Sequence, residues 1–278
     1  MGKQYYPDRD TIKLQTEILK SKSLLEEDKL LPSLDGKFTP YRYFKHNVSI
    51  EPLDSFSYKS VLLYPEFESI KEKARVVPYT VPIERNFAIV ELQDLTNEKR
   101  ITNLLYDAIY EGIPISDLKI GLEIVTLRML EAVKEGFRDI VLTDRDVLPS
   151  RVSMPLPFVL AFAESFLKES GIDLKDISIF IETSEVINPF EIATLLSLGS
   201  KGVHIRDIDE ELVDILNRYV FDLVRKKGYS DVPEFVGSKN VKVVGLKNDF
   251  LSLINADLIS SFEVEGLAEI ESYLFSQK

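Results

Sequence analysis

The segment "GFRDIVLTDRDVLPSRVSMPLPFVLAFAESF", residues 136–166, decides the fold class. It contains a short β-branched run, Asp139–Thr143, which is typical of a strand. After the polar pair Asp144 and Arg145 and a loop, apolar residues return at helical spacing over Met154–Ser170. Gly171 follows where a helix is expected to end. A strand that leads through a polar loop into a helix is the repeating unit of α/β proteins, so we expect such a fold.

The same alternation continues twice more along the chain. Ile177–Ile181 predicts a second strand, and Pro189 can begin a helix that Asn188 caps. A third strand is expected over Gly202–Ile205, and Asp209 can open the amphipathic helix that follows. This order predicts parallel strands with right-handed crossovers, in an open α/β sheet or an incomplete (β/α) barrel.

Other segments extend this pattern. We expect further strands at 87–92 and 241–246, and helices at 97–111, 117–135 and 267–275. The first 85 residues are rich in tyrosine and proline and do not show the alternation. We therefore divide the chain into an irregular N-terminal arm or subdomain, residues 1–85, and an α/β core, residues 86–278.

Charge and hydropathy exclude several classes of protein. The chain has 46 acidic and 34 basic residues and a formal net charge of −12, which would repel a phosphate backbone, so we expect no nucleic-acid partner. No apolar run approaches the roughly 20 residues that a membrane-spanning helix needs. The polar start of the sequence lacks the apolar segment of a secretory signal, so we expect a cytoplasmic location.

The chain contains no cysteine and only two histidines. Disulfides, thiolate zinc sites, iron–sulfur ligation and a cysteine nucleophile are therefore excluded within these residues. His46 and His204 lie far apart in sequence, which argues against a histidine-rich metal site or a conventional serine–histidine–aspartate triad.

Two strand-end segments resemble a known family. "IVLTDRDVLPSRVSMPLPFVLA", residues 140–161, is similar to a segment of glutamate synthase large subunits in which Leu-Ser-Asp-Arg ends a strand and Ile-Pro-x-Leu-Leu-Ala begins a helix. "SIFIETSEVINPFEIATLLSLGSKGVH", residues 178–204, resembles the family's Val-Val-Glu-Thr-Gly-Glu segment and the helix after it. Glu182, Thr183 and Glu185 match, whereas Ser184 replaces the glycine. The resemblance is to the central domain of these subunits.

Fainter similarities and clear departures accompany this match. Residues 39–56 resemble the linker that leaves the glutaminase domain, and residues 235–246 and 260–270 resemble the first elements of the FMN-binding synthase domain. A long portion of the family's central domain is missing between residues 56 and 86. The family's Ser-Lys-Met-Gly-Ile-Ser, which helps to form the flavin and substrate site, would fall at residues 225–230, where little of it survives.

The resemblance implies a role without catalysis by this chain. In the family, the glutaminase uses an N-terminal cysteine and the iron–sulfur cluster uses cysteines, and this chain has none. We therefore expect a structural or docking component of glutamate synthesis, the conversion of glutamine and 2-oxoglutarate into glutamate. Its expected partners are glutaminase-type and FMN-dependent synthase subunits, which would bring the FMN and the iron–sulfur cluster. A homo-oligomer is left open.

The polar residues at the strand ends form a candidate rim, made of Asp144, Arg145, Glu182, Glu185 and Arg206. Such a rim could bind a small anion through the arginines, as an independent binding protein or enzyme would, and Glu182 with Glu185 could serve acid–base chemistry or Mg²⁺. Alternatively, these charges pair with one another and hold loops in place. No third carboxylate stands at convincing spacing, so we prefer the second interpretation and assign no catalytic, cofactor-binding or metal-binding residue.

Three further features have structural explanations. His204 lies within an apolar strand and is expected to be a core residue with satisfied hydrogen bonds. Gly237-Ser238-Lys239 is similar to a phosphate-binding loop but is too short to be one. The basic run at residues 225–227 is expected at a helix C-terminus, where it complements the helix dipole.

Overall fold

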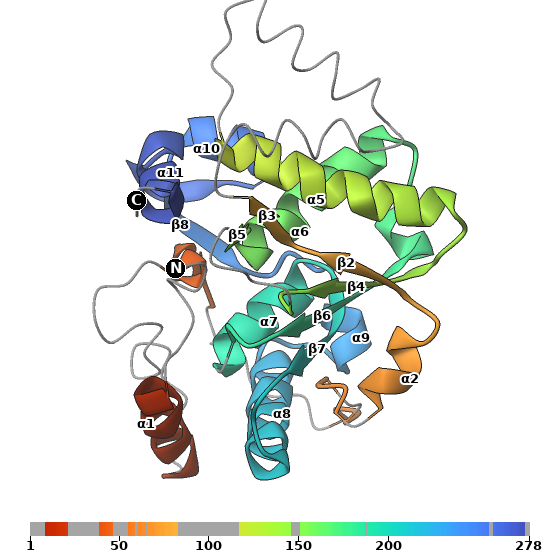
Figure 1. Ribbon diagram of the computed structural model, residues 1–278. Helices are drawn as coiled ribbons and strands as arrows, with labels where there is room; N and C mark the ends of the chain where they lie inside the picture. Colours follow the sequence, from red (N-terminus) through yellow and green to blue (C-terminus); the bar gives the residue numbers. More distant parts are fainter. Residues whose placement is uncertain are drawn as a thin grey trace, which may run out of the picture.

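The structure is a computed structural model that describes residues 9–21, 39–46, 55–58, 61–64, 66–82, 117–145, 151–186, 188–255 and 258–275. At its centre is a parallel four-stranded sheet in the order β2-β4-β6-β7, seen in the middle of Figure 1. The strands of this sheet are β2 (Arg75–Pro78), β4 (Asp139–Thr143), β6 (Ser178–Thr183) and β7 (Ser200–Ile205).

Apolar residues on both faces of the sheet explain why these short runs form strands. Ile140, Val141 and Leu142 of β4 are all fully buried, although neighbouring side chains along a strand point to opposite faces. A strand that is covered on both faces shows a continuous apolar run in place of alternation. The register places Ile140 beside Ile179 and Leu142 beside Ile181, so branched side chains of β4 and β6 pack side by side.

Four long helices connect or follow these strands: α5 (Asp117–Lys134), α6 (Leu156–Glu169), α7 (Pro189–Ser197) and α8 (Glu210–Lys226). The predicted caps are confirmed. Asn188 accepts a hydrogen bond of 2.8 Å from the Phe190 amide, and Asp209 accepts one of 2.8 Å from the Leu212 amide. Gly171 has a φ of +81°, a left-handed conformation that suits glycine after the last turn of α6.

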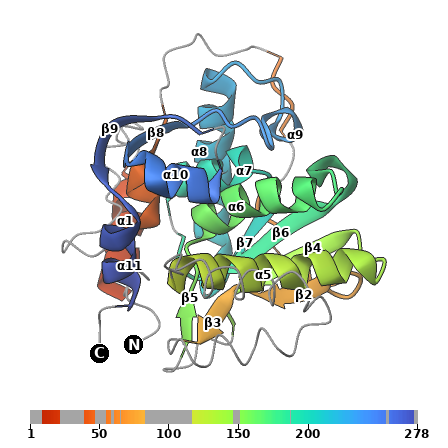
Figure 2. The ribbon, with the colours of Figure 1, turned by 90° about the horizontal axis from the view of Figure 1, so that it is seen from above.

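The strand order follows the chain order, which confirms the predicted parallel α/β arrangement. Because the crossovers have the same hand, each successive strand is added at the same edge of the sheet. Helix α5 packs against α6, and α7 packs against α8 (Figure 2). Within the described residues β2 and β7 are the two edges, so no closed barrel forms there. The result is the open form of the expected α/β fold.

A second sheet lies apart from the first and contains three strands in the order β1-β8-β9: β1 (Phe44–Lys45), β8 (Lys242–Leu246) and β9 (Ser260–Glu265). β1 runs antiparallel to β8, and β9 runs parallel to it. Figure 2 shows β8 and β9 side by side near α10 (Asn248–Ile254). The strand expected at 241–246 is therefore confirmed as β8, but it does not join the central sheet.

The remaining elements are short or peripheral. A two-stranded antiparallel sheet consists of β3 (Thr80–Pro82) and β5 (Arg151–Ser153). The other helices are α1 (Arg9–Lys20), η2 (Pro40–Tyr43), α2 (Phe67–Lys71), η3 (Leu174–Asp176), α9 (Val232–Phe235) and α11 (Leu267–Phe275). No helix among the described residues is both long and apolar enough to cross a membrane.

The structure corrects one expectation for the N-terminal region. Residues 75–82 were expected in an irregular arm, but they form β2 and β3, and β2 pairs in parallel with β4. A four-residue strand that ends in proline and leaves Val76 39% exposed has too little pattern to be recognised from sequence. The expected strand at 87–92 and helix at 97–111 lie outside the described residues.

Residues 39–46, called here the linker segment, contact helix α6 of the core and the three-stranded sheet. Tyr43 and Phe44 pack against Phe158 of α6, with ring centroids 6.2 Å and 6.3 Å away. On the other side, Arg42 forms an ion pair of 2.5 Å with Glu265 of β9, and the Tyr43 hydroxyl donates to the same carboxylate. The linker segment therefore fastens the small sheet to the α/β core.

Candidate functional site

The predicted rim lies at the carboxyl ends of β4, β6 and β7. Thr143 is beside Glu182, and Glu182 is beside His204, so these three side chains form one row across the sheet. Thr183 is the next residue along β6, and its side chain points to the opposite face. The rim therefore divides into two clusters, one on each face of the sheet.

The first, the Glu182 cluster, consists of Lys71, Thr143, Arg145 and Glu182. Arg145 donates to Glu182 Oε1 from Nε at 2.8 Å and from Nη2 at 2.5 Å, and the Thr143 hydroxyl donates to Oε2 at 2.7 Å. Lys71 Nζ lies 3.4 Å from Oε1. Burial by itself raises the pKa of Glu182, but the hydrogen bonds from Arg145 and Thr143 and the charge of Lys71 outweigh it and lower the pKa to about 2. Its neighbours thus stabilise the ionised form of this buried carboxylate.

The second, the Asp144 cluster, consists of Tyr79, Asp144, Thr183 and Arg206. Asp144 pairs with Arg206 through Oδ1, and its Oδ2 accepts from the Thr183 hydroxyl at 2.9 Å and from the Ser184 amide at 3.1 Å. The Tyr79 and Thr183 hydroxyls are 2.9 Å apart. The Asp144 carboxylate is therefore bonded to groups from β6 and from the end of β7.

Glu185 lies beside the Asp144 cluster, and its amide donates a hydrogen bond of 3.0 Å to the Thr183 hydroxyl. It is buried, and its Oε1 accepts a hydrogen bond of 2.9 Å from Tyr41 in the linker segment. Burial, together with the nearby negative charges of Asp144 and Glu191, raises the pKa of Glu185 well above its ordinary value despite the hydrogen bonds from Tyr41 and Tyr79. The carboxylate pair of Glu182 and Glu185 considered from the sequence is not formed, because Glu182 bonds to Arg145 and Glu185 to Tyr41.

His204 is buried beside the Glu182 cluster. Its ring stacks on Phe67 at 4.4 Å and on Tyr64 at 5.6 Å, with interplanar angles of 6° and 7°. Burial lowers the pKa of His204 below its ordinary value, even though Glu182 and Glu68 act in the opposite direction. The histidine is in the core, as predicted, but its hydrogen bonds are not all satisfied: among the described residues the buried Nδ1 has no partner.

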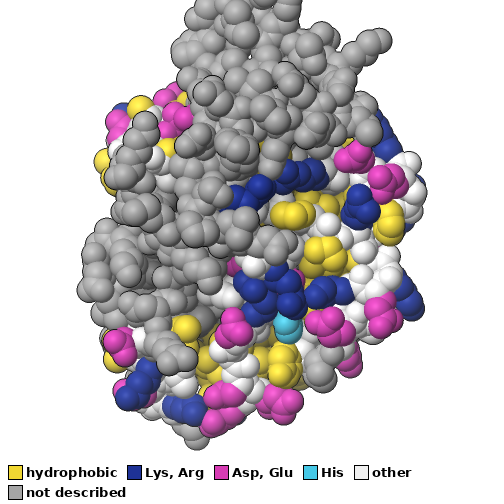
Figure 3. Space-filling view, in the orientation of Figure 1, with side chains coloured by type: hydrophobic (Ala, Val, Ile, Leu, Met, Phe, Trp, Pro, Cys, Tyr) yellow, Lys and Arg dark blue, Asp and Glu magenta, His cyan; other side chains and the backbone are white. Residues whose placement is uncertain are grey.

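The surface over this edge is strongly charged. Figure 3 shows Lys and Arg side chains gathered next to a histidine on this face of the molecule. The Arg145 side chain is 47% exposed and that of Arg206 is 18% exposed, while both carboxylates they pair with are fully buried. The rim therefore presents arginines outward and keeps its carboxylates inside.

Some contributors to the site could have been recognised from sequence and others could not. Thr143 and Thr183 end otherwise apolar strands, so their polar character was a signal that was missed. Lys71 and Tyr79 come from α2 and from the residue between β2 and β3, far from the rim in sequence, and no local pattern marks them.

Neither a metal-binding cluster nor a phosphate-binding loop is found in the part of the chain that the structure describes. The described residues contain no cluster of three or more histidine, aspartate or glutamate side chains that could hold a metal ion. In the loop at Gly237-Ser238-Lys239, the amides of Gly237 and Lys239 donate at 2.9 Å to the carbonyl groups of Leu196 and Ser197. These amides are engaged in the fold, so the loop does not match a phosphate-binding loop.

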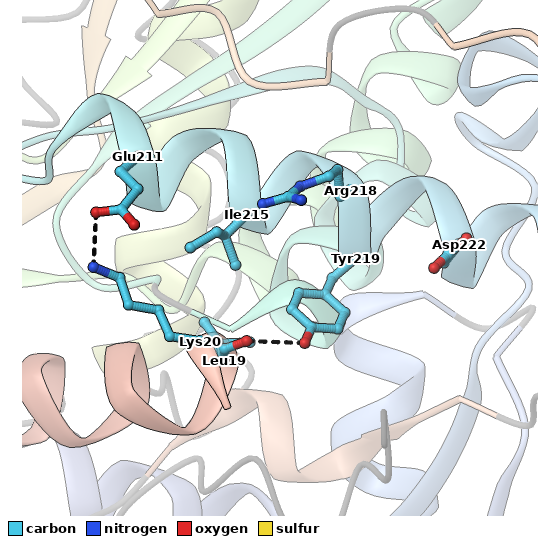
Figure 4. A pocket seen from close by; sticks show the side chains of 7 residues that line it. All are labelled: Leu19, Lys20, Glu211, Ile215, Arg218, Tyr219 and Asp222. Carbon is cyan, nitrogen blue, oxygen red and sulfur yellow. Dashed lines mark hydrogen bonds and ion pairs between the residues drawn. The ribbon is translucent and has the colours of Figure 1, made fainter. Parts of the chain in front are cut away.

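A separate hollow of about 470 Å³ lies between α1 and α8. Figure 4 shows Lys20 of α1 directed toward Glu211, which it contacts at 2.8 Å, and the Tyr219 hydroxyl directed toward the Leu19 carbonyl, to which it donates at 2.9 Å. These contacts attach α1 to the outer surface of α8, away from the rim.

Comparison with known protein families shows which family the chain belongs to. A family model described as the glutamate synthase central domain matches residues 59–277. The chain belongs to the glutamate synthase central domain family. The matched region contains both rim clusters and all of the central sheet.

Other comparisons add little. No curated protein matches the chain. Three similar solved structures are a mutant flavocytochrome b2 with benzoylformate, a double mutant with pyruvate bound, and the recombinant flavin-binding domain of baker's yeast flavocytochrome b2. They are 19%, 21% and 20% identical, with TM-scores of 0.36, 0.34 and 0.36. The matches cover 48%, 40% and 49% of this chain but only 34%, 31% and 35% of those chains. At these scores the likeness carries no argument about this protein.

Proposed function

We propose that this member of the glutamate synthase central domain family is a non-catalytic docking component of glutamate synthesis. Its partners would be glutaminase-type and FMN-dependent synthase subunits. Those partners would supply the cysteine nucleophile, the FMN and the iron–sulfur cluster, because these 278 residues include no cysteine.

The observation that carries the proposal is the pairing of both rim arginines with buried carboxylates of the same chain. Arg145 binds Glu182, and Arg206 binds Asp144. A catalytic acid or base works best when its pKa lies near the working pH. A carboxyl with a pKa of about 2 that already accepts three short hydrogen bonds is better suited to holding strand ends together.

An exposed apolar edge supports docking. On and beside β9, Ile259, Phe262 and Val264 are 86%, 82% and 65% exposed. Adjacent exposed apolar side chains are typical of a surface that another protein covers. We assign this edge to the FMN-dependent synthase subunit, because residues 260–270 resemble the first elements of the synthase domain.

Co-purification with the two partner subunits tests the proposal. We expect a complex whose rate of glutamate formation from glutamine and 2-oxoglutarate exceeds that of the partners without this chain. Replacing Phe262 and Val264 by serine should weaken binding of the synthase subunit about tenfold. The matched control replaces Tyr58 by serine, because this aromatic side chain is also 65% exposed but does not lie on β9. Turnover by the purified chain alone, or binding to neither subunit, would refute the proposal.

A second candidate function is small-anion binding at the rim. It is favoured by the exposure of 47% of the Arg145 side chain, beside Lys71. Thermal-shift measurements with 2-oxoglutarate, glutamate, FMN and phosphate separate the two functions. A large stabilisation by one of these anions that is lost in Arg145→Ala would support anion binding.

A further inference from the structure

A groove lies near the amino ends of β6 and β7, away from the rim. It consists of two hollows of about 350 Å³ and 420 Å³ that share Glu164, Asp173, Leu174 and Lys175. Because the hollows share these residues, they adjoin one another, between α6, η3 and the turns that follow α7 and α9. We call the two hollows together the basic groove.

Its charge is opposite to that of the whole chain. Four lysines line it, Lys168, Lys175, Lys201 and Lys239, against the two carboxylates of Glu164 and Asp173. The net local charge is thus +2 (four minus two), on a protein with a net charge of −12.

Only part of this positive charge is neutralised within the chain. Lys239 pairs with Glu164 at 2.9 Å, and Lys201 donates to the Ser178 hydroxyl at 3.0 Å. Asp173 caps η3 by accepting from the Lys175 amide at 2.9 Å. Lys168 and Lys175 are exposed and make no ion pair with any described residue.

The lining between the lysines is apolar and not aromatic. Ile172, Leu174, Leu198 and Val236 contribute to it. Single-stranded nucleic acids are usually bound by aromatic side chains on which the bases stack, and neither hollow is lined by one. A small inorganic anion would use the lysines but not the apolar surface.

We propose that the basic groove binds a peptide segment of a partner protein that is rich in acidic residues and leucine. Carboxylates of the segment would pair with Lys168 and Lys175 at the margin, while aliphatic side chains cover the partly exposed Leu174 and Val236. Charge complementarity of this kind speeds association and selects among partners. The inference does not require that the chain act in glutamate synthesis.

Fluorescence anisotropy with a labelled peptide tests the inference. The probe has the sequence Glu-Leu-Glu-Glu-Leu-Glu-Glu-Leu-Glu, and it is titrated with the full-length chain. We expect saturable binding that weakens as salt is raised. The double variant Lys168→Gln/Lys175→Gln should lower the affinity about fivefold, in keeping with the loss of two exposed charge pairs.

Matched controls define the outcomes. Lys73→Gln removes an exposed lysine outside the groove and should leave the affinity unchanged. A probe with glutamine in place of glutamate tests the charges, and one with glycine in place of leucine tests the apolar surface; both should bind more weakly. The inference is overturned if the original probe does not bind, if either altered probe binds equally well, or if pyrophosphate competes as strongly as the unlabelled peptide. None of these readouts depends on glutamate formation.

Discussion

At the scale of single residues, the alternation of side chains along β6 decides which charges meet. Glu182 and Thr183 are neighbours in sequence, yet one bonds to Arg145 and Thr143 and the other to Asp144 and Tyr79. From the sequence, the rim was expected as one mixed-charge surface. The structure instead contains two clusters on opposite faces of the sheet, and Glu185 lies beside the Asp144 cluster.

Replacing Glu182 by glutamine tests the first cluster. The pKa of Glu182 is lowered from 4.5 to about 2, so its ionised form stabilises the fold above pH 4.5, and this contribution is lost as the pH falls toward 2. We expect Glu182→Gln to lower the free energy of unfolding at pH 7 by about 2 kcal/mol. Urea unfolding at pH 7 and pH 3 should show the difference from wild type shrinking at the lower pH. An equal effect of Glu72→Gln, which changes an exposed carboxyl, would contradict this.

Replacing Glu185 by glutamine should raise the free energy of unfolding, whereas replacing Glu182 should lower it. The folded protein raises the pKa of this carboxyl above its ordinary 4.5, so Glu185 contributes stability below that pH and the contribution is lost as the pH rises through the raised pKa. Glutamine stays uncharged and can still accept from Tyr41. We therefore expect Glu185→Gln to be more stable than wild type at pH 8, by about 1 kcal/mol, and similar to it at pH 4. A variant that is less stable at both pH values would exclude this account.

At the scale of elements, the sequence predicted correctly those features that depend on residues close together in the chain. Asn188 and Asp209 were recognised as caps, and α5, α7 and α11 lie within one or two residues of their expected bounds. The failures involve contacts between distant segments. Residues 75–82 become strands only because β4 and β5 offer pairing partners, and Lys71 reaches Glu182 across 111 positions.

The cap of α8 provides a test at this scale. Asp209 accepts from the Leu212 amide, and losing such a cap costs about 1 kcal/mol. We expect Asp209→Ala to lower the free energy of unfolding by this amount. Asp209→Asn retains an oxygen acceptor and should remain close to wild type. Equal losses in the two variants, measured by urea unfolding, would show that the charge and not the cap is responsible.

At the scale of the whole molecule, the fold class and parallel order followed from the sequence, but the second sheet did not. Phe44 and Lys45 give no strand pattern in only two residues, and they pair with β8 from the other end of the chain. The family resemblance was confirmed over residues 59–277, whereas the role of the rim remains a proposal.

The overall charge supports a further prediction. A net charge of −12 repels itself in the compact state, and salt screens this repulsion. We expect the Tm to rise by about 2–4 °C between low and moderate concentrations of sodium chloride, measured by scanning calorimetry. A fall in Tm would mean that the ion pairs on the surface outweigh the repulsion.

The pairing of β1 with β8 also has a consequence for how the protein is made. Phe44 pairs with Val243, which leaves the ribosome 199 residues later (243 − 44). At about 5–20 residues per second this delay lasts about 10–40 s. Throughout that time the aromatic side chains of residues 39–46 lack their final cover. A nascent chain with this topology depends on being kept from aggregation until its last strands emerge.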